Sequence, residues 1–280
     1  MKNVLKITTL AAVAGVLAFV LAACGGNAAP ASSAASSGAA EGGKIVVAAT
    51  PAPHADILRD AVAPILAEKG YELEVQEFTD YVLPNTATEE GEVDANFFQH
   101  DPYLNNFNEE QGTHLVSVLG VHVEPMSVYA GKTSSLEDLP NGAHVAVPND
   151  ATNEGRALLL LQTAGLITLS DPENLEATPK DIKDNPKNLQ FVEVEAATVP
   201  TVLPDVDIAV INGNYAISAN LDSSLALFTE GAESPYVNVI VVKEGNENNP
   251  AVQALVEATL SDSVREYINS KYNGEVVAVF

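Results

Sequence analysis

The sequence predicts an α/β fold in which two similar lobes each contain a mainly parallel sheet. β-branched runs alternate with segments of helical periodicity along the body of the chain, which is the pattern of strands connected by helices. Two strand–loop–helix units, starting at Ile45 and Val145, indicate that this arrangement occurs twice. The chain has 280 residues, of which 46% are hydrophobic, and is long enough to build two lobes with cores of their own.

The first half of the body begins with a β-branched run at residues 44–49, which predicts a buried strand. Residues 56–69 carry apolar side chains at helical spacing and are followed by Gly70, which predicts a helix with a glycine stop. Residues 71–75 alternate between polar and apolar side chains and predict a half-exposed strand. Further strands are expected at 93–98, leading into a polar and aromatic loop, and at 115–123 and 127–130.

The second half repeats the unit, with a strand at 143–148 and a leucine-rich helix at 153–163. The remaining expected elements are strands at 207–212 and 238–242 and a pair of helices within 250–269. Ligands of open α/β sheets bind beyond the carboxyl ends of the strands. We therefore expect a site at the loops that follow Ala49, Phe98, Val147 and Ile211.

The N-terminus has the features of a lipoprotein signal peptide. Lys2 and Lys6 form a basic segment, and the apolar run at residues 10–23 fits a secretory signal better than a membrane-spanning helix. The run ends in the sequence LAACGG, which resembles a bacterial lipobox and contains the single cysteine of the chain, Cys24. An ordinary signal peptide that happens to contain a cysteine is the alternative. We expect residues 1–23 to be removed and Cys24 to carry a diacylglycerol, whose two acyl chains suffice for stable anchoring.

Residues 24–43 are expected to form a tether at the membrane surface. Their Gly/Ala/Ser-rich sequence has too few large apolar side chains to build a core, so it predicts a flexible linker after the lipidated cysteine. A lipid, a tether and a globular body place the protein at the extracytoplasmic face of the cell membrane, held there by its anchor.

Charge and composition exclude several kinds of function. The net charge of −25 argues against nucleic acid as a partner, because phosphates require Lys and Arg. One cysteine allows neither an intrachain disulfide nor a cysteine-based metal centre. The chain contains no phosphate-binding loop, zinc-protease motif or nucleophile elbow. We therefore expect no catalytic residues, no enzyme activity, no cofactor and no metal.

Three segments contain candidate binding residues, and each also has a structural interpretation. Residues 149–156 join a strand to a helix, so the helix N-terminus and Arg156 could hold a carboxylate, or the segment could simply cap the helix. Residues 97–103 combine aromatics, amides and His100, which suits an apolar pocket, although aromatic pairs are more often core. Residues 211–215 offer asparagines after a buried strand, although Asn-Gly more often marks a plain turn.

Several longer motifs in register give the sequence a family resemblance. They include FTDYVLPN at 78–85, DANFFQH at 94–100, TNEGRAL at 152–158, AVINGNYA at 209–216 and SPYVN at 234–238. On these motifs the chain resembles the NlpA family of lipoproteins, and within it the methionine-binding type, over residues 44–280.

The resemblance implies a two-lobed periplasmic-binding-protein fold of type II with two crossings between the lobes. Lobe 1 would comprise residues 44–130 and 239–280, and lobe 2 residues 131–238. The ligand would lie in the cleft between them, with its side chain among aromatics and its α-carboxylate on Arg156. The residues implied to bind the ligand are Tyr81, Phe97, Phe98, His100, Tyr103, Asn153, Arg156, Asn212, Tyr215 and Asn238.

The implied function is capture of L-methionine, or D-methionine, for an ABC importer. The implied partners are the ligand, the permease with its ATPase subunits, and the membrane through the lipid anchor; the protein would be a monomer. One alternative is the same fold with another amino acid or a methionine peptide. A second is a metal-capturing lipoprotein using His54, His100 and acids, and a hydrolase ranks last because no nucleophile motif is present.

Overall fold

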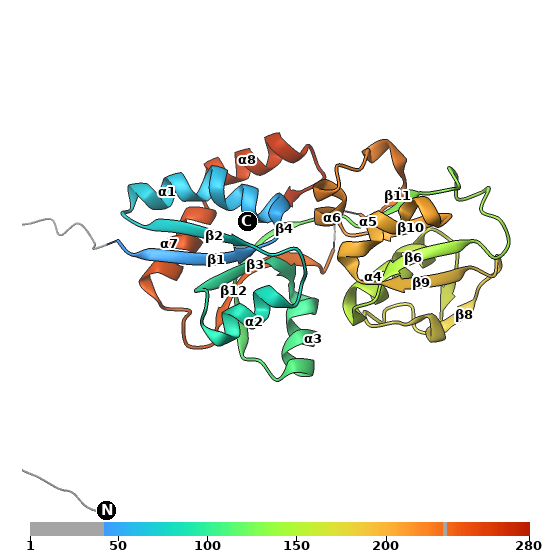
Figure 1. Ribbon diagram of the computed structural model, residues 1–280, viewed down its shortest axis with the longest axis horizontal. Helices are drawn as coiled ribbons and strands as arrows, with labels where there is room; N and C mark the ends of the chain where they lie inside the picture. The colour runs from blue at the N-terminus through green and yellow to red at the C-terminus, as the bar shows by residue number, and fades with distance from the viewer. Residues whose placement is uncertain (1–41, 232–233) are drawn as a thin grey trace, which may run out of the picture. The chain divides into compact units, whose positions relative to one another are not determined.

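The computed structural model describes residues 42–231 and 234–280, which form two main sheets with helices around each (Figure 1). The expected signal peptide, the lipidated Cys24 and residues 24–41 of the tether lie outside the described residues. No helix of the described part combines the length and the apolar character that crossing a membrane requires.

The first sheet has six strands in the order β13-β4-β12-β3-β1-β2. Strand β1 pairs in parallel with β2 and β3, whereas β12 and β13 pair antiparallel to their neighbours. The bounds are β1 Lys44–Ala49, β2 Glu72–Glu77, β3 Ala95–His100, β4 Leu115–Val123, β12 Val237–Lys243 and β13 Val277–Ala278.

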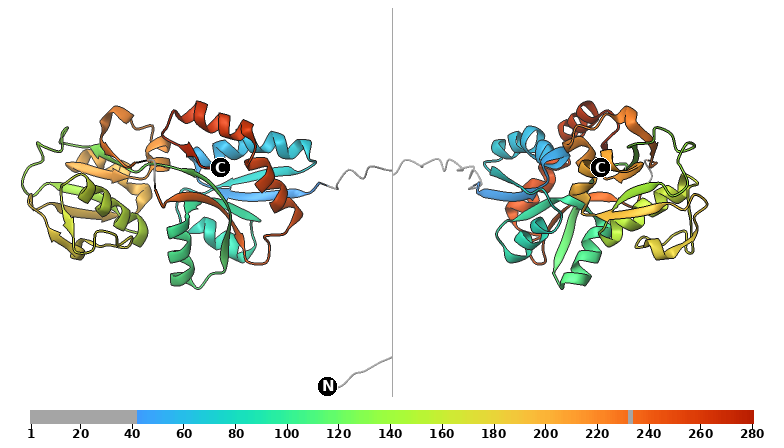
Figure 2. Two further views of the ribbon diagram at one scale, coloured as in Figure 1. Left: turned by 180° about the vertical axis from the view of Figure 1, so that it is seen from behind. Right: turned by 45° about the vertical axis from the view of Figure 1, so that its right-hand side comes forward.

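Helices cover both faces of this sheet (Figures 1 and 2). One face carries α1, α7 and α8, whose apolar side chains pack with Val47, Phe97 and Ile240 in the largest core cluster. The other face carries α2 and α3, which pack through Ala87 and Leu104. The bounds are η1 Pro51–Ala55, η2 Leu58–Val62, α1 Ala63–Glu68, α2 Leu83–Glu90, α3 Asp101–Gln111, α7 Pro250–Thr259 and α8 Asp262–Tyr272.

The second sheet has five strands in the order β11-β5-β10-β6-β9, with parallel pairing of β6 to both β9 and β10. Its core contains the leucines of α4 together with Val145, Val147 and Ile208. The bounds are β5 Ser127–Ala130, β6 His144–Pro148, α4 Ala151–Thr163, β9 Gln190–Val194, α5 Val199–Val202, β10 Ile208–Ile211, α6 Gly213–Ser218 and β11 Ala226–Thr229. The shorter elements are β7 Thr168–Leu169, η3 Pro179–Asp181, β8 Ile182–Asp184, η4 Ala196–Thr198, η5 Leu203–Asp205 and η6 Ser223–Leu225.

The sheets are mixed, whereas the sequence pattern predicted mainly parallel ones. The chain passes between the sheets twice, from β4 to β5 and from β11 to β12. These four strands make the antiparallel pairs of the two sheets. The helix-connected strands make the parallel ones, as βαβ connections require.

The strand pairing also differs from the lobe boundaries expected at residues 130 and 238. Strand β5, Ser127–Ala130, belongs to the second sheet, and β12 joins the first sheet from Val237 onward. We therefore propose that the lobes divide between β4 and β5 and between β11 and β12. The segment after residue 98 is likewise not a loop, because β3 continues to His100 and α3 begins at Asp101.

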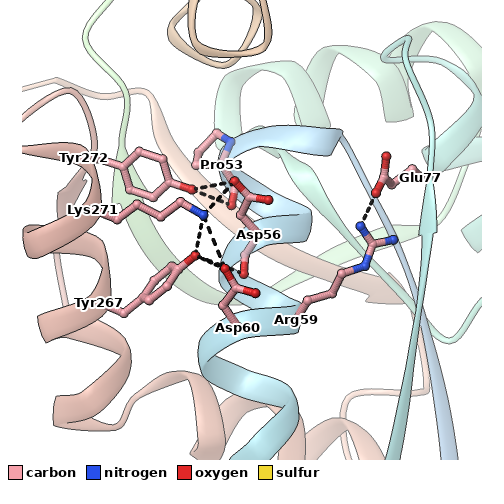
Figure 3. A network of polar contacts seen from close by, with 8 residues as sticks. All are labelled: Pro53, Asp56, Arg59, Asp60, Glu77, Tyr267, Lys271 and Tyr272. Carbon is pink, nitrogen blue, oxygen red and sulfur yellow. Dashed lines mark hydrogen bonds and ion pairs between the residues drawn. The ribbon is translucent and has the colours of Figure 1, made fainter. Parts of the chain in front are cut away.

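The C-terminal helix α8 is tied to the N-terminal helical segment by a polar network (Figure 3). Lys271 Nζ lies 3.0 Å from Asp56 Oδ2 and 3.3 Å from Asp60 Oδ2, and it also donates to the hydroxyl of Tyr267. The hydroxyl of Tyr272 donates to Asp56 Oδ2 at 3.3 Å. Helix α8 and the N-terminal helical segment that contains Asp56 and Asp60 are thus held together on the same face of the first sheet.

Candidate functional site

A small cavity lies between the two sheets and is lined by residues of both. It lies beyond the ends of β3, β6 and β10, the edge at which open α/β sheets bind ligands. Its lining residues are Tyr81, Phe98, Gln99, His100, Tyr103, Glu124, Asn153, Arg156, Asn212, Gly213, Asn214 and Asn238.

One wall is aromatic. Tyr81, Phe98 and Tyr103 pack with ring centroids 5.7 to 6.1 Å apart. His100 sits at the junction of β3 and α3, where its Nδ1 accepts a hydrogen bond from the backbone N–H of Tyr103 at 3.1 Å and caps the helix. Burial, and secondarily the charge of Arg156, lower the pKa of His100 to about 3, so the ring is neutral at pH 7.

The N-terminus of α4 supplies the opposite wall. Asp150 caps this helix by accepting from the backbone N–H of Asn153 at 3.0 Å. The side-chain oxygen of Asn153 lies 3.3 Å from His100 Nε2 and accepts from Asn212 Nδ2 at 2.6 Å. Asn153 therefore links the ends of strands from both sheets.

Arg156 is the cation of the cavity wall, and it is buried. Its guanidinium pairs side-on with Glu230 through Nε, at 3.1 Å, and through Nη2. Nη2 also donates to the backbone oxygen of Glu124 at 2.8 Å, and the guanidinium lies 4.2 Å from the ring centre of Tyr236. Among the contacts of the described residues, Nη1 has no acceptor, so this end of the fork remains available to an anion.

Glu124 forms a buried cluster with two histidines just behind the cavity. Its Oε1 lies 2.8 Å from His122 Nε2 and 3.2 Å from His54 Nε2. Burial alone would raise the pKa of the Glu124 carboxyl, but the neighbouring His54, the His122 hydrogen bond and Arg156 outweigh it and lower the pKa. Glu124 is thus an ionised carboxylate at the cavity.

Two amide groups at the cavity are incompletely paired. Asn212 Oδ1 and Asn214 Nδ2 are buried and have no hydrogen-bond partner within the described residues. Buried polar atoms in native proteins are nearly always paired with protein, water or ligand. One unpaired acceptor and one unpaired donor in the same cavity suit a small ligand that carries both kinds of group.

Eight of the ten residues expected to bind the ligand line this cavity: Tyr81, Phe98, His100, Tyr103, Asn153, Arg156, Asn212 and Asn238. Phe97 does not line it, because successive side chains along a strand point to opposite faces of the sheet. Phe97 lies in the core under α1, α7 and α8, where its ring centroid is 4.6 Å from that of His54. Tyr215 lines a neighbouring pocket and donates its hydroxyl to the backbone oxygen of Thr79 at 3.1 Å.

Sequence reasoning missed four lining residues, Gln99, Glu124, Gly213 and Asn214. Gln99, Gly213 and Asn214 lie inside motifs that carry the family resemblance, so the signal was present but was assigned to neighbouring residues. Glu124 opens a further short motif of the resemblance, EPM at 124–126, so a signal was present there too and was not assigned to the site.

The histidines do not meet in the way that the metal-capture alternative supposed. His54 lies with His122 and Glu124, whose potential ligand atoms are within 4.8 Å of one another, whereas His100 contacts Tyr103 and Asn153. In the cluster of His54, His122 and Glu124, both ring nitrogens that face the carboxylate lie within hydrogen-bond distance of it.

Two α/β lobes, two crossings between them and a small cavity at the strand ends define a two-lobed solute-binding protein of the periplasmic-binding type. The sequence profile of the NlpA lipoprotein family matches residues 45–280. The chain belongs to the NlpA lipoprotein family.

Three relatives show how close the similarity is. The methionine-binding lipoprotein MetQ of Bacillus subtilis is 42% identical over 94% of this chain and 95% of its own. A nutrient-binding protein from Burkholderia cenocepacia, whose structure was solved with methionine bound, is 43% identical with a TM-score of 0.81, covering 84% of this chain and all of that one (100%). An ABC-transporter periplasmic substrate-binding protein from Coxiella burnetii is 41% identical with a TM-score of 0.79, covering 84% and 100%.

Proposed function

We propose that this protein captures methionine in the cleft between its lobes and delivers it to an ABC importer, without catalysing a reaction. The observation that carries the proposal is the composition of the cavity, which joins an aromatic wall to a buried arginine whose Nη1 has no acceptor among the described residues. The similarity to a methionine-binding lipoprotein and to a structure with methionine bound supports the same ligand.

Each part of methionine has a chemically suited partner in the cavity. A thioether packs favourably against aromatic rings, which Tyr81, Phe98 and Tyr103 supply. The α-carboxylate would accept hydrogen bonds from Arg156 Nη1. The unpaired amide atoms of Asn212 and Asn214 would gain partners from the ligand's polar groups. A ligand that leaves such buried groups unpaired is disfavoured, which gives the site its selectivity.

The membrane attachment and the transport partners complete the proposal. A diacylglycerol on Cys24 would hold the body near the extracytoplasmic face of the membrane, with residues 24–43 as the tether. The loaded protein would act as a monomer and dock on the permease, whose ATPase subunits drive import. The similarity to an ABC-transporter substrate-binding protein supports these partners.

The test is titration calorimetry on the protein after it has been unfolded and refolded to remove bound ligand. We expect one-to-one binding of methionine and a loss of about 100-fold in affinity in Arg156→Ala, because a buried carboxylate then loses its charged partner. Arg59→Ala is the matched control, since Arg59 is exposed and pairs with Glu77 at the surface.

If a different amino acid binds and methionine gives no heat, the proposed ligand is wrong but the capture function stands. Equal affinity in Arg156→Ala and the parent protein would remove Arg156 as the carboxylate site.

A further inference from the structure

We propose that Gln99 is a positioning residue that fixes the aromatic wall of the cavity and thereby limits the length of the ligand side chain that the cleft accepts. Gln99 does this through a buried network of polar side chains that joins β3 to α2. This inference rests on the proposed function and deepens it, since it assigns the part of the structure that sets side-chain selectivity.

Strand β3 contains a β-bulge where it reaches the cavity. Val239 of β12 pairs with Gln99, and the next residue of β12, Ile240, pairs with Phe97. Phe98 is therefore an extra residue that has no counterpart on β12. Bulges interrupt a regular strand and are common next to functional sites, where they change the direction of a side chain.

The bulge brings two consecutive side chains to one side of the sheet. Phe97 packs in the core under α1, α7 and α8, whereas Phe98 packs against α3 on the other face. Regular alternation would return Gln99 to the side of Phe97. Instead, the Gln99 side chain bonds to α2, which lies on the same face as α3, and both Phe98 and Gln99 line the cavity.

Four buried polar residues form the network behind the bulge, and none of them is more than 3% exposed. The amides of Gln99 and Asn85 bond to each other twice, at 2.6 Å through Gln99 Nε2 and at 2.9 Å through Asn85 Nδ2. Gln99 Nε2 also donates to Asn96 Oδ1 at 2.8 Å. Asn96 Nδ2 donates to Asn85 Oδ1 at 3.1 Å and to Thr88 Oγ1 at 2.7 Å. The hydroxyl of Thr88 donates in turn to the backbone oxygen of Pro84 at 2.7 Å.

The network uses both donors of Gln99 and fixes the orientation of its amide. The two Nε2 hydrogens point to the side-chain oxygens of Asn85 and Asn96, so the amide has no donor left for a ligand. Exchanging the nitrogen and oxygen of Gln99 would bring acceptors against those two oxygens. Each nitrogen and oxygen of the four side chains has at least one hydrogen bond, and a buried network that is fully paired is rigid.

Both parts of the aromatic wall are attached to this network. Asn85 lies in the first turn of α2, which begins two residues after Tyr81. Phe98 is the neighbour of Gln99, and its ring centroid lies 5.8 Å from that of Tyr81. Four hydrogen bonds of the network cross from β3 to α2. They oppose any shift of α2 against β3, and such a shift would change the separation of the two rings.

A rigid wall is the condition under which one methylene group affects affinity. A hydrophobic pocket separates ligands that differ by one methylene by about 10- to 200-fold. The extra volume is costly because close-packed walls yield only at the expense of strained side chains and a shifted backbone. Ethionine carries an S-ethyl group where methionine carries an S-methyl group, so the ratio of their affinities measures how firmly the wall is held.

The experiment titrates methionine and ethionine separately into the refolded, ligand-free protein. Gln99→Met keeps the length of the side chain and removes its hydrogen bonds. Gln190→Met is the matched control, since Gln190 is exposed on β9 and its amide donates only to the backbone oxygen of Asn188. We expect the parent and the control to prefer methionine by at least about 10-fold, and Gln99→Met to prefer it by only about 2-fold.

Two further variants test whether Gln99 acts through the network. We expect Asn85→Leu to lower the preference as far as Gln99→Met does, and the double variant to lower it no further, because residues of one network are not additive. Thr88→Val alters only the outer end of the network and should lower the preference by about 3-fold, the effect of one neutral hydrogen bond. Urea denaturation identifies the folded variants, and Thr88→Val decides if the other two do not fold.

The ratio of affinities separates positioning from a role in stability alone. A purely structural role would weaken both ligands together and leave the ratio unchanged. If the parent binds neither ligand, the proposed function fails, and this inference fails with it. If the parent binds both ligands equally, capture of methionine stands and the wall does not limit side-chain length. If the folded Gln99→Met and Thr88→Val variants keep the full preference, Gln99 does not position the wall.

Discussion

Gly213 shows how one residue without a side chain shapes the candidate site. It follows Asn212 in an Asn-Gly pair, which by sequence alone most often marks a turn. In the structure it begins α6, and a Cβ added there would lie 2.8 Å from Glu124 Cβ. The glycine is therefore required for the close approach of the second lobe to Glu124.

We predict that Gly213→Ala lowers methionine affinity by about 10-fold and the free energy of unfolding by about 1–3 kcal/mol, because Glu124 or α6 must move to admit the methyl group. Titration calorimetry and urea denaturation measure the two effects. Gly231→Ala is the control, since the described residues, chain neighbours aside, place no atom within 4 Å of the Cβ position at Gly231. An alanine variant with parent affinity would show that the contact between α6 and Glu124 does not shape the site.

The pair of Phe97 and Phe98 shows what a single position can decide. Both were expected to contact the ligand, yet only Phe98 lines the cavity. Adjacent side chains on a strand point to opposite faces, so at most one of the two can face the cleft. Which of them does so depends on the register of β3 against β1 and β12, and no property of the two phenylalanines reveals it.

At the scale of elements, α8 closes the first lobe through charge as well as apolar packing. Val264 and Ile268 pack into the core of the first sheet, and Lys271 pairs with two aspartates of the N-terminal helical segment (Figure 3). Burial, and secondarily the hydrogen bond to Asp60, raise the pKa of Tyr267 to about 12, so its hydroxyl remains a donor at neutral pH.

We predict that Lys271→Met lowers the free energy of unfolding by about 1 kcal/mol at low salt and by less at high salt, because the network is partly exposed and screened by ions. Urea denaturation at two salt concentrations measures this. Lys44→Met is the control, since Lys44 makes one exposed ion pair with Glu74, and such pairs contribute little. Equal losses in the two variants would indicate that the network adds nothing beyond a single surface pair.

Element α3 was not expected from the sequence, and the reason is local. Its sequence, DPYLNNFNEEQ, is polar and has a proline near its start, which resembles a loop. Proline is tolerated in the first turn of a helix, and Tyr103, Leu104 and Phe107 supply a narrow buried stripe. Tertiary packing of that stripe, together with the cap from His100, favours the helix over the loop.

At the scale of the whole molecule, burial of two neutral histidines links folding to pH. Burial is the main cause that lowers the pKa of His54 to about 4 and that of His100 to about 3, against 6.5 for a free histidine. At a pH between the folded pKa and 6.5, each histidine binds a proton in the unfolded chain but not in the folded protein. Stability is therefore complete above about pH 6.5 and falls as the pH drops toward 4.

We predict that the free energy of unfolding falls by about 1.4 kcal/mol per pH unit for each of these histidines between about pH 6 and pH 4.5. Denaturation at a series of pH values measures the slope. His100→Gln should make the slope shallower, whereas His144→Gln should not, because the side chain of His144 is 61% exposed. A parent slope retained in His100→Gln would mean that His100 is protonated in the folded state.

The two lobes are also connected at the cleft itself. The hydroxyl of Tyr81 donates to Asn214 Oδ1 at 2.6 Å, and that of Tyr215 donates to the backbone oxygen of Thr79 across the same boundary. The only cavity cation, within the described chain, bonds to residues of both crossings, Glu124 and Glu230. We therefore expect ligand binding and the relative position of the lobes to involve the same side chains, which would couple occupancy to closure.

The sequence by itself determined the elements with strong periodicity, the two repeated strand–loop–helix units and the family. The elements and the repeated units depend on local pattern, which a single chain displays directly. Most of the cavity lining was implied by the family resemblance, whereas the residues alone favoured core packing around His100 and a plain turn at Asn212.

Only the tertiary structure decided which charges meet. It paired Arg156 with Glu230, joined His54 to His122 and Glu124, assigned β5 to the second sheet and turned Phe97 away from the cleft. Each of these contacts depends on which distant segments of the chain meet and on the register of the strands. Local spacing of residues encodes neither the meeting of distant segments nor the register, because the packing of the whole molecule determines them.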